Sequence, residues 1–345
     1  MIPPHTVSND PGTIWAKDTK PAVDTPPDGE TDPAPESAWP ASAARTGIYG
    51  VVTPHVVPAA SDGWRMYYTQ ILPRPGYPAG ANDYDNATTR ILSATSADGV
   101  TWSPEAGVRL TASQGGAGDY RVVSPEVVPL TNGSERLRMY FECNPGAQSV
   151  ASSIRSALSD DGGTTWAVEP GERFSAGGSY NSPRIIFLDD GRWRLYCSDR
   201  GVGIVSAISE DGGVTFEREA GERIVPTTSY EAMTTFAPEV LRITGGGYRM
   251  YFAGYSAMDC AHVLSATSED GLHWDKEPEP VIAPGGPLDR SKCSEMCVMP
   301  IETNDGPAFR MFYEACDGTA PDERGVWRII SATAGPATLS EEERS

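Results

Sequence analysis

The sequence predicts an all-β protein, a single five-bladed β-propeller whose ring is closed by an N-terminal outer strand in the last blade. Three observations predict this fold: a strand motif that occurs five times, a turn motif after the first four copies, and an N-terminal segment that matches an outer strand. All 345 residues then belong to one domain. Its expected parts are an outer strand at 13–23, a surface linker at 24–44, and blades at 46–110, 118–174, 178–225, 232–284 and 291–335.

The repeated strand motif has an aromatic residue or leucine first, then arginine, then apolar and aromatic residues. Its five copies lie at 64–68, 137–141, 193–197, 248–252 and 309–313. A β-branched strand precedes each copy, and a third strand ending in a Ser-Ala pair follows it. A unit of this length matches a propeller blade, in which these are the inner, second and third strands and an outer strand follows.

A turn of the form Ser-x-Asp-Gly, with an aromatic residue after it, follows the first four copies at 96–102, 159–166, 209–216 and 268–274. The aspartate caps the turn and the glycine supplies a positive φ. These turns resemble the structural Asp-box turns of sialidase-type propellers. The fifth copy has no such turn after it, but residues 15–23 match the outer strand 274–282. We therefore expect 15–23 to pair into blade five and cover its open edge.

Composition narrows the choice of partners and location. The formal net charge of −20 disfavours nucleic acid and anionic membranes, which attract basic proteins, and no apolar run is long enough for a membrane helix. Residues 1–17 have neither a basic start nor an apolar segment, so we expect a cytoplasmic protein, or a secreted one if a leader has been removed. The six cysteines include no Cys-x-x-Cys pair, and we expect reduced thiols. Cys260, Cys293, Cys297 and Cys316 should gather as free thiols near blade five, on the functional face.

One face of the propeller should carry the function. Its connections are longer than the tight turns of the other face, and 70–89 is the longest of them. Aligned in register, the inner strands place different polar residues at an otherwise repeated position: His55, Glu126, Arg184, Glu239 and Cys297. Two residues earlier they carry Thr53, Ser124, Ser182, Ala237 and Glu295. Because the strand period is two, both rings should face the axial channel.

These side chains suggest acid–base chemistry on the axis. Glu126 and Glu239 are the predicted catalytic carboxyls, one poised as acid and the other as base. The predicted substrate-binding residues are His55, Arg184, Cys297, Glu295, Tyr120, Tyr180, Tyr230 and Tyr255. No cofactor is certain, but an axial metal ion could be held by His55, Glu126, Glu239 and Cys297.

The whole chain, over about 13–335, resembles the five-bladed propellers of arabinanases, β-xylosidases, invertases, levansucrases and mannoside phosphorylases. The resemblance rests on the blade count and on the pattern of strand and turn motifs. It implies a glycoside hydrolase-like fold, with inner-strand Asp-Pro segments and a glutamate as catalytic groups. Here the residue before proline is Thr53, Ser124, Ser182 or Ala237, so those aspartates have no counterpart. Glu142-Cys143 resembles the Glu-Cys pair of invertases, but we interpret it as part of a repeated strand.

Three functions fit these observations. The first is a carbohydrate-active enzyme that cleaves or transfers a glycosyl group of a small glycoside or oligosaccharide by means of Glu126 and Glu239, with aromatic residues stacking on the sugar. The second is a lyase, cyclase or isomerase, with or without a metal, on a small molecule held by the same ring. The third is a propeller that binds a ligand without catalysis.

Overall fold

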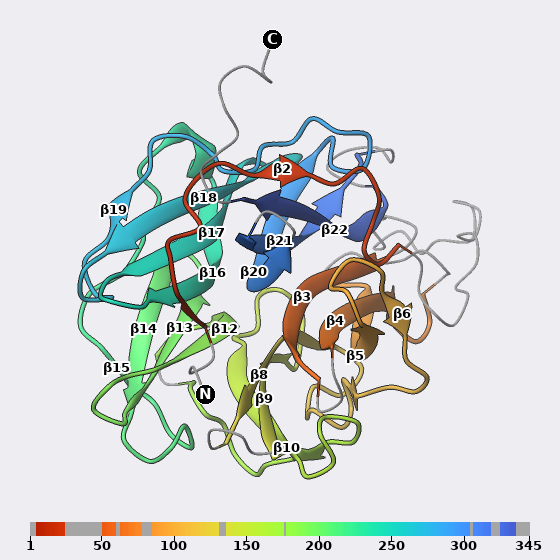
Figure 1. Ribbon diagram of the computed structural model, residues 1–345. Helices are drawn as coiled ribbons and strands as arrows, with labels where there is room; N and C mark the ends of the chain where they lie inside the picture. Colours follow the sequence, from red (N-terminus) through yellow and green to blue (C-terminus); the bar gives the residue numbers. More distant parts are fainter. Residues whose placement is uncertain are drawn as a thin grey trace, which may run out of the picture.

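The computed structural model describes residues 5–24, 50–59, 63–77, 85–130, 136–175, 177–303, 306–318 and 325–335. These residues form sheets arranged around a central axis, the β-propeller predicted from the sequence (Figure 1). They include one short 3₁₀ turn, η2 (Ser229–Glu231), and no helix that is long and apolar enough to cross a membrane. Of the predicted surface linker at 24–44, all but Asp24 lies outside the described residues.

The described strands pair into five antiparallel units that follow one another along the chain. Blade 1 contains β3 (Gly50–Pro58), β4 (Trp64–Pro73), β5 (Ala87–Ser96), β6 (Ser103–Pro104) and β7 (Leu110–Thr111). Blade 2 contains β8 (Arg121–Pro129), β9 (Leu137–Asn144), β10 (Ser153–Ser159) and β11 (Ala167–Val168). Blade 3 contains β12 (Tyr180–Phe187), β13 (Trp193–Asp199), β14 (Gly203–Ser209) and β15 (Glu217–Arg218).

The predicted loop at 70–89 is shorter than expected because β4 and β5 extend into it at both ends.

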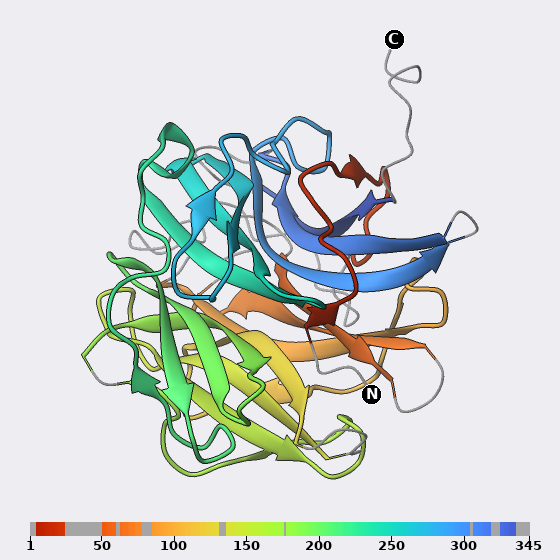
Figure 2. The ribbon, with the colours of Figure 1, turned by 60° about the vertical axis from the view of Figure 1, so that its left-hand side comes forward.

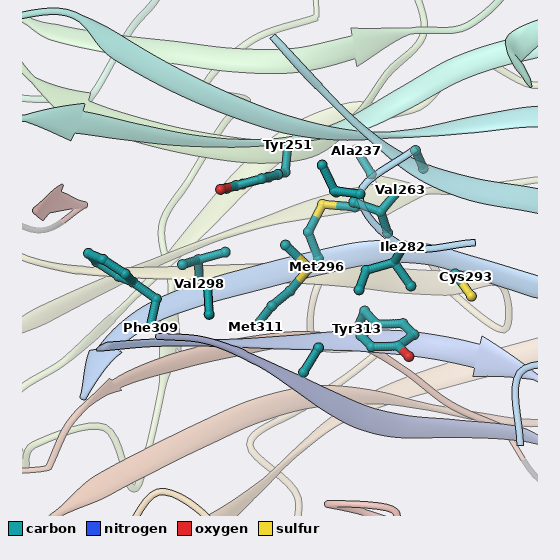
Figure 3. Close-up of a cluster of buried hydrophobic side chains, with 14 of the residues drawn as sticks. Ala237, Tyr251, Val263, Ile282, Cys293, Met296, Val298, Phe309, Met311 and Tyr313 are labelled. Atoms are coloured by element: carbon teal, nitrogen blue, oxygen red, sulfur yellow. The ribbon is translucent and has the colours of Figure 1, made fainter. Parts of the chain in front are cut away.

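Blade 4 contains β16 (Thr234–Ile243), β17 (Tyr248–Ala257), β18 (Cys260–Ser268) and β19 (Asp275–Lys276). Blade 5 contains β20 (Lys292–Thr303), β21 (Gly306–Cys316) and β22 (Trp327–Ala334). Hydrophobic clusters fill the space between neighbouring blades. Figure 3 shows the cluster between blades 4 and 5, where Tyr251 and Val263 face Met296 and Met311. These four side chains are fully buried.

The arginine of the strand motif and the serine of the third strand hold the outer part of blades 1, 2 and 3 in the same way. In blade 1, Arg65 Nε and Ser93 Oγ both donate to Glu105 Oε2, over 2.8 and 2.7 Å. The same triad recurs in blade 2 as Arg138, Ser156 and Glu169, and in blade 3 as Arg194, Ser206 and Glu219. Charge-assisted bonds to one carboxylate thus fasten the short outer strand to the second and third strands. The sequence repeat is therefore a repeat of this contact.

The N-terminus completes blade 5, as the sequence predicts. Strand β2 (Ala16–Lys17) pairs antiparallel with β22, with Lys17 opposite Ala332, and Val23 bridges to Ile329. In Figure 1 this red strand lies beside the blue strands of the C-terminal blade. Asp18 supplies the carboxylate of the corresponding triad in blade 5, with Arg310 at 2.8 Å.

An Asp-box-like turn precedes this strand, a feature that the sequence analysis did not identify. Asp10 Oδ1 accepts the Gly12 amide at 3.0 Å, and Trp15 Nε1 donates to the Gly12 carbonyl at 3.3 Å. Tyr251 of blade 4 donates to the same carbonyl at 2.6 Å, as Tyr196 of blade 3 does to Gly271 at 2.8 Å. The missing fifth turn is therefore at the start of the chain, where Pro11 interrupts the Asp-Gly pair that marks the other four.

Residues 5–24, which we call the N-terminal strap, run from the axis to the outer edge of blade 5 (Figures 1 and 2). At the axial end, β1 (Thr6–Val7) pairs parallel with the inner strand β16, opposite Arg242 and Ile243. The strap therefore touches both the innermost and the outermost parts of the propeller.

Candidate functional site

A bulge interrupts every inner strand at the same place and divides it into two parts. In blades 1 to 4 the bulged residue precedes proline and has a left-handed backbone, with φ of 50–54° at Thr53, Ser124, Ser182 and Ala237. In blade 5 the register shift falls at Glu295. A non-glycine residue with this backbone costs about 1–3 kcal/mol, so the surrounding fold must hold the bulge in place. Residues before and at the bulge line a cavity, and residues after it lie deeper.

The deeper residues are His55, Glu126, Arg184, Glu239 and Cys297, which we call the axial belt. The sequence predicts that they converge, and each of them contacts the next blade around the ring. His55 Nε2 lies 3.1 Å from the Val127 carbonyl, and Glu126 Oε1 accepts the Ile185 amide at 3.0 Å. Arg184 Nε donates to Glu239 Oε2 at 2.7 Å, and Glu239 Oε1 accepts the Val298 amide at 2.8 Å. The Val56 amide donates to Cys297 Sγ at 3.3 Å, which returns the chain of contacts to blade 1.

The axial belt is closed to solvent. Glu126 and Glu239 are 0% exposed, and His55, Arg184 and Cys297 are at most 2% exposed. Burial raises the pKa of the Cys297 thiol well above its usual range, so the thiol stays neutral. None of the five residues lines the axial cavity. In this structure the belt residues join neighbouring blades. The sequence analysis predicted a different role, with Glu126 and Glu239 as catalytic carboxyls and His55, Arg184 and Cys297 as substrate-binding residues.

The axial cavity lies above the belt, on the side of the N-terminal halves of the inner strands. Its volume is about 380 Å³. Its charged lining residues are three carboxyls and three cations: Glu142, Glu295, Glu314, Arg121, Arg200 and Lys292. Aromatic and small polar residues complete the wall, among them Tyr255, Phe236, Trp327, Ser124, Ser182 and Asn181. Lys292 Nζ lies 5.5 Å from the ring centre of Tyr255 and 5.3 Å from that of Trp327.

Two of the three carboxyls are buried close to each other in blade 5. Glu314 Oε1 lies 2.6 Å from Ser294 Oγ, and its Oε2 accepts the Thr53 amide at 3.1 Å. Burial, together with the charge of Glu295, raises the pKa of Glu314 to about 8. Burial also raises the pKa of Glu295, against the opposing effect of nearby hydroxyls and of Arg184. At neutral pH Glu314 therefore holds a proton that it could donate.

The predicted sugar-binding aromatics are distributed differently from the expectation. Tyr255 and the predicted Glu295 line the cavity. Tyr120 lines a separate surface pocket, where Arg74 stacks 4.3 Å above its ring centre. Tyr180 is 1% exposed and packs on Phe174, so its assignment to the rim is wrong. The alternation of strand β12 explains the error, because the next residue, Asn181, faces the cavity instead.

Tyr230 also lies away from the axis. Its hydroxyl donates to Glu279 at 3.0 Å and its ring contacts His262. Two further cavity residues are Glu142, which the sequence analysis interpreted as part of a repeated strand, and Glu314, which it did not single out. Both stand four positions after the repeated arginine, where the other blades have Thr69, Ser198 and Ala253. Variation at this repeated position was the available signal.

The cysteines are all unpaired. Cys260, Cys293 and Cys316 stand at the ends of β18, β20 and β21, where Ala261 lies opposite Lys292 and Lys292 opposite Cys316. These three thiols therefore lie at the cavity end of blades 4 and 5, as expected. Cys297 lies deeper, in the axial belt.

The metal-ligand geometry on the axis involves a residue that the sequence analysis did not include. Among the described residues, one group of potential ligand atoms lies within 4.8 Å of one another, and it comprises His5, His55 and Glu126. Glu239 and Cys297, which were predicted as further ligands, are engaged by Arg184 and by the Val56 amide.

The fold and its axial cavity define a β-propeller with a buried carboxyl-bearing pocket, and solved structures identify the proteins that share this fold. A glycoside hydrolase is 14% identical, with a TM-score of 0.68 and 93% of each chain covered. A thermostable family-43 glycoside hydrolase is 18% identical, with a TM-score of 0.63, over 85% of this chain and 96% of that one.

A third similar structure is an N-acetylgalactosamine deacetylase from F. plautii in complex with blood group B trisaccharide. It is 15% identical, with a TM-score of 0.59, over 92% of this chain and 95% of that one. No protein-family model matches the sequence, and no curated protein matches it. The chain thus has the propeller fold of glycoside hydrolases, with a sequence far from theirs.

Proposed function

We propose that the protein is a carbohydrate-active enzyme, a glycoside hydrolase-like protein that cleaves or transfers a glycosyl group in the axial cavity. The observation that carries the proposal is the pair of buried carboxyls, Glu295 and Glu314, in the wall of that cavity. The fold shared with glycoside hydrolases supports it, and so does a similar structure whose name includes a bound oligosaccharide.

Glu314 would act as the general acid. Its pKa of about 8 keeps it protonated at neutral pH, and the charge of Glu295 helps to hold the proton there. Glu142, from the equivalent position of blade 2, would supply the second carboxyl as base or nucleophile. Tyr255 and Trp327 offer rings for stacking on a sugar face, and Arg121, Arg200 and Lys292 offer donors to its oxygens.

The glycosidase proposal is tested with a panel of aryl glycosides and the variants Glu314→Gln and Glu142→Gln. We expect either variant to lose about 10²–10⁴-fold in turnover on a glycoside with a poor leaving group. Glu314→Gln should recover much of that loss on a dinitrophenyl glycoside, whose departure needs no proton. Equal losses on both leaving groups would contradict the acid role.

A matched control separates the cavity from the belt. Glu239→Gln alters a buried carboxyl that does not line the cavity and should keep the parent turnover. Loss of turnover in Glu239→Gln, with full activity in Glu314→Gln, would instead favour the belt carboxyls predicted from the sequence. No described contact favours a lyase or isomerase, since that alternative relied on belt residues that do not line the cavity.

A further inference from the structure

We propose that His5, His55 and Glu126 form a binding site for a divalent transition metal ion, zinc being the natural probe, and that the ion fixes the N-terminal strap to blades 1 and 2. The three residues come from three separate parts of the chain: the strap, β3 and β8. The site lies below the axial cavity, so the proposal does not depend on the proposed function.

The hydrogen-bond partners of His55 point to a cation beside its Nδ1. Its Nε2 lies 3.1 Å from the carbonyl oxygen of Val127, which can only accept a hydrogen bond, so Nε2 carries a hydrogen. In the neutral ring Nδ1 then has a lone pair. This lone pair faces Glu126 Oε2, 3.0 Å away. Two acceptors at this distance repel each other unless a cation lies between them.

This short contact is not a hydrogen bond. His55 Nδ1 and Glu126 Oε2 are both buried, and neither has a hydrogen-bond partner among the described residues. The ring is therefore not oriented to donate along an N–H bond to this oxygen, although both side chains are closed to solvent. A metal ion can bind both atoms, because each ligand atom points at the ion and not at the other ligand.

The surrounding charge calls for a second cation. Glu126 and Glu239 are both 0% exposed, and among the described residues one arginine contacts them, Arg184, at 3.8 and 2.7 Å from their nearest oxygens. Buried carboxylates are stable only when they are paired. The second positive charge is supplied either by the imidazolium of His5, which is hydrogen-bonded to Glu126, or by a metal ion, and zinc titration distinguishes the two.

His5 brings a second imidazole to the same carboxylate. Its Nε2 lies 2.9 Å from Glu126 Oε1, and its side chain is 7% exposed. Two imidazoles and one carboxylate are ligands that suit Zn²⁺ and neighbouring transition metals. The hydrogen bond from His55 to a main-chain carbonyl is the usual support of a metal-bound histidine, because it fixes the ring and the tautomer.

Zinc binding to the full-length protein tests the proposal. Protein freed of metal by dialysis against a chelator is titrated with Zn²⁺ in competition with a chromophoric chelator, and with Co²⁺ by visible absorption. We expect one equivalent of each ion to bind, with the absorption of a nitrogen- and oxygen-ligated Co²⁺ site. Zinc at 100 times its dissociation constant should raise Tm by about 4 °C.

His5→Ala and His55→Gln should abolish the stoichiometric binding and the zinc-dependent rise in Tm. The matched control is His273→Ala, because His273 is 90% exposed and its ionic partner among the described residues is Asp270. It should leave both readouts unchanged. His5→Ala keeps the strap contacts of Asp10, Trp15 and β2, so it should fold.

Two results would overturn the proposal. One is the absence of any bound equivalent of zinc or cobalt by the parent protein. The other is binding that His5→Ala retains at parental strength, since it would place the ion elsewhere.

Discussion

Replacing Asp10 by alanine should loosen the N-terminal strap and lower the stability of the whole ring. Asp10 holds Arg249 of blade 4 through two bonds of 2.8 and 2.6 Å, and the arginine side chain is only 5% exposed. Loss of a partner from a buried ion pair costs about 3–5 kcal/mol. Asp10 is 36% exposed and Glu277 remains 3.2 Å from Arg249, so we expect about 1–2 kcal/mol instead.

The corresponding change in Tm follows from the size of the protein. An unfolding entropy of about 2.1 cal/mol/K per residue gives about 0.7 kcal/mol/K for this chain, so a loss of about 1.5 kcal/mol lowers Tm by about 2 °C. Differential scanning calorimetry of Asp10→Ala measures this shift. The control is Asp160→Ala, which removes an exposed partner from Arg136 and should change Tm by less than about 1 °C.

The pH dependence and a double variant sharpen the test. Bonds from Arg249 and from the Gly12 amide lower the pKa of Asp10 despite its partial burial. Its stabilising effect is therefore complete above the unfolded pKa of about 3.9 and is lost as the pH falls through the lower folded value. Asp10→Ala combined with Glu277→Ala should cost more than the sum of the single variants, because Arg249 then keeps no carboxylate. Additive effects, or a shift no larger than that of Asp160→Ala, would refute the anchoring role of Asp10.

Two further predictions concern the belt and the cavity. Glu239→Gln removes the nearer carboxylate from the buried Arg184 and leaves Glu126 at 3.8 Å, which should cost about 2–4 kcal/mol and lower Tm by about 3–6 °C in calorimetry. An unchanged Tm would show that the pair does not join the blades. Turnover on unactivated glycosides should fall as the pH rises through about 8, because Glu314 then loses the proton that it donates; a pH–rate profile without that alkaline limb would contradict its role.

The blades were predictable because the same arginine–serine–carboxylate contact occurs in several of them and conserves the residues that make it along the chain. Arg65, Ser93 and Glu105 recur in equivalent positions, so the sequence repeats wherever the triad does. The closing strand was predictable for the same reason, since 15–23 had to complete a blade. The preceding turn was not recognised, because Pro11 separates Asp10 from Gly12 and conceals the Asp-Gly signature.

The sequence placed the belt residues at the axis, but it did not show that they are buried below the cavity and do not line it. Register alignment brought His55 and Glu126 to the axis, yet it could not show that their partners are main-chain groups of the next blade. A bulge in each inner strand sets the boundary between cavity and belt, and four of the five bulges fall at a residue before proline. The contribution of His5 depends on the path of the strap, which no local pattern encodes.

The N-terminal strap has a consequence for the synthesis of the protein. Its residues leave the ribosome before their partners in β16 (Thr234–Ile243) and β22 (Trp327–Ala334). During translation the strap therefore has no strand partner until β16 has been synthesised. Closure then joins segments separated by nearly the whole chain, the kind of contact that forms slowly. A nascent or C-terminally truncated chain therefore presents two open sheet edges at once, one on the last blade made and one on the strap, and both are sites where chains can pair with each other.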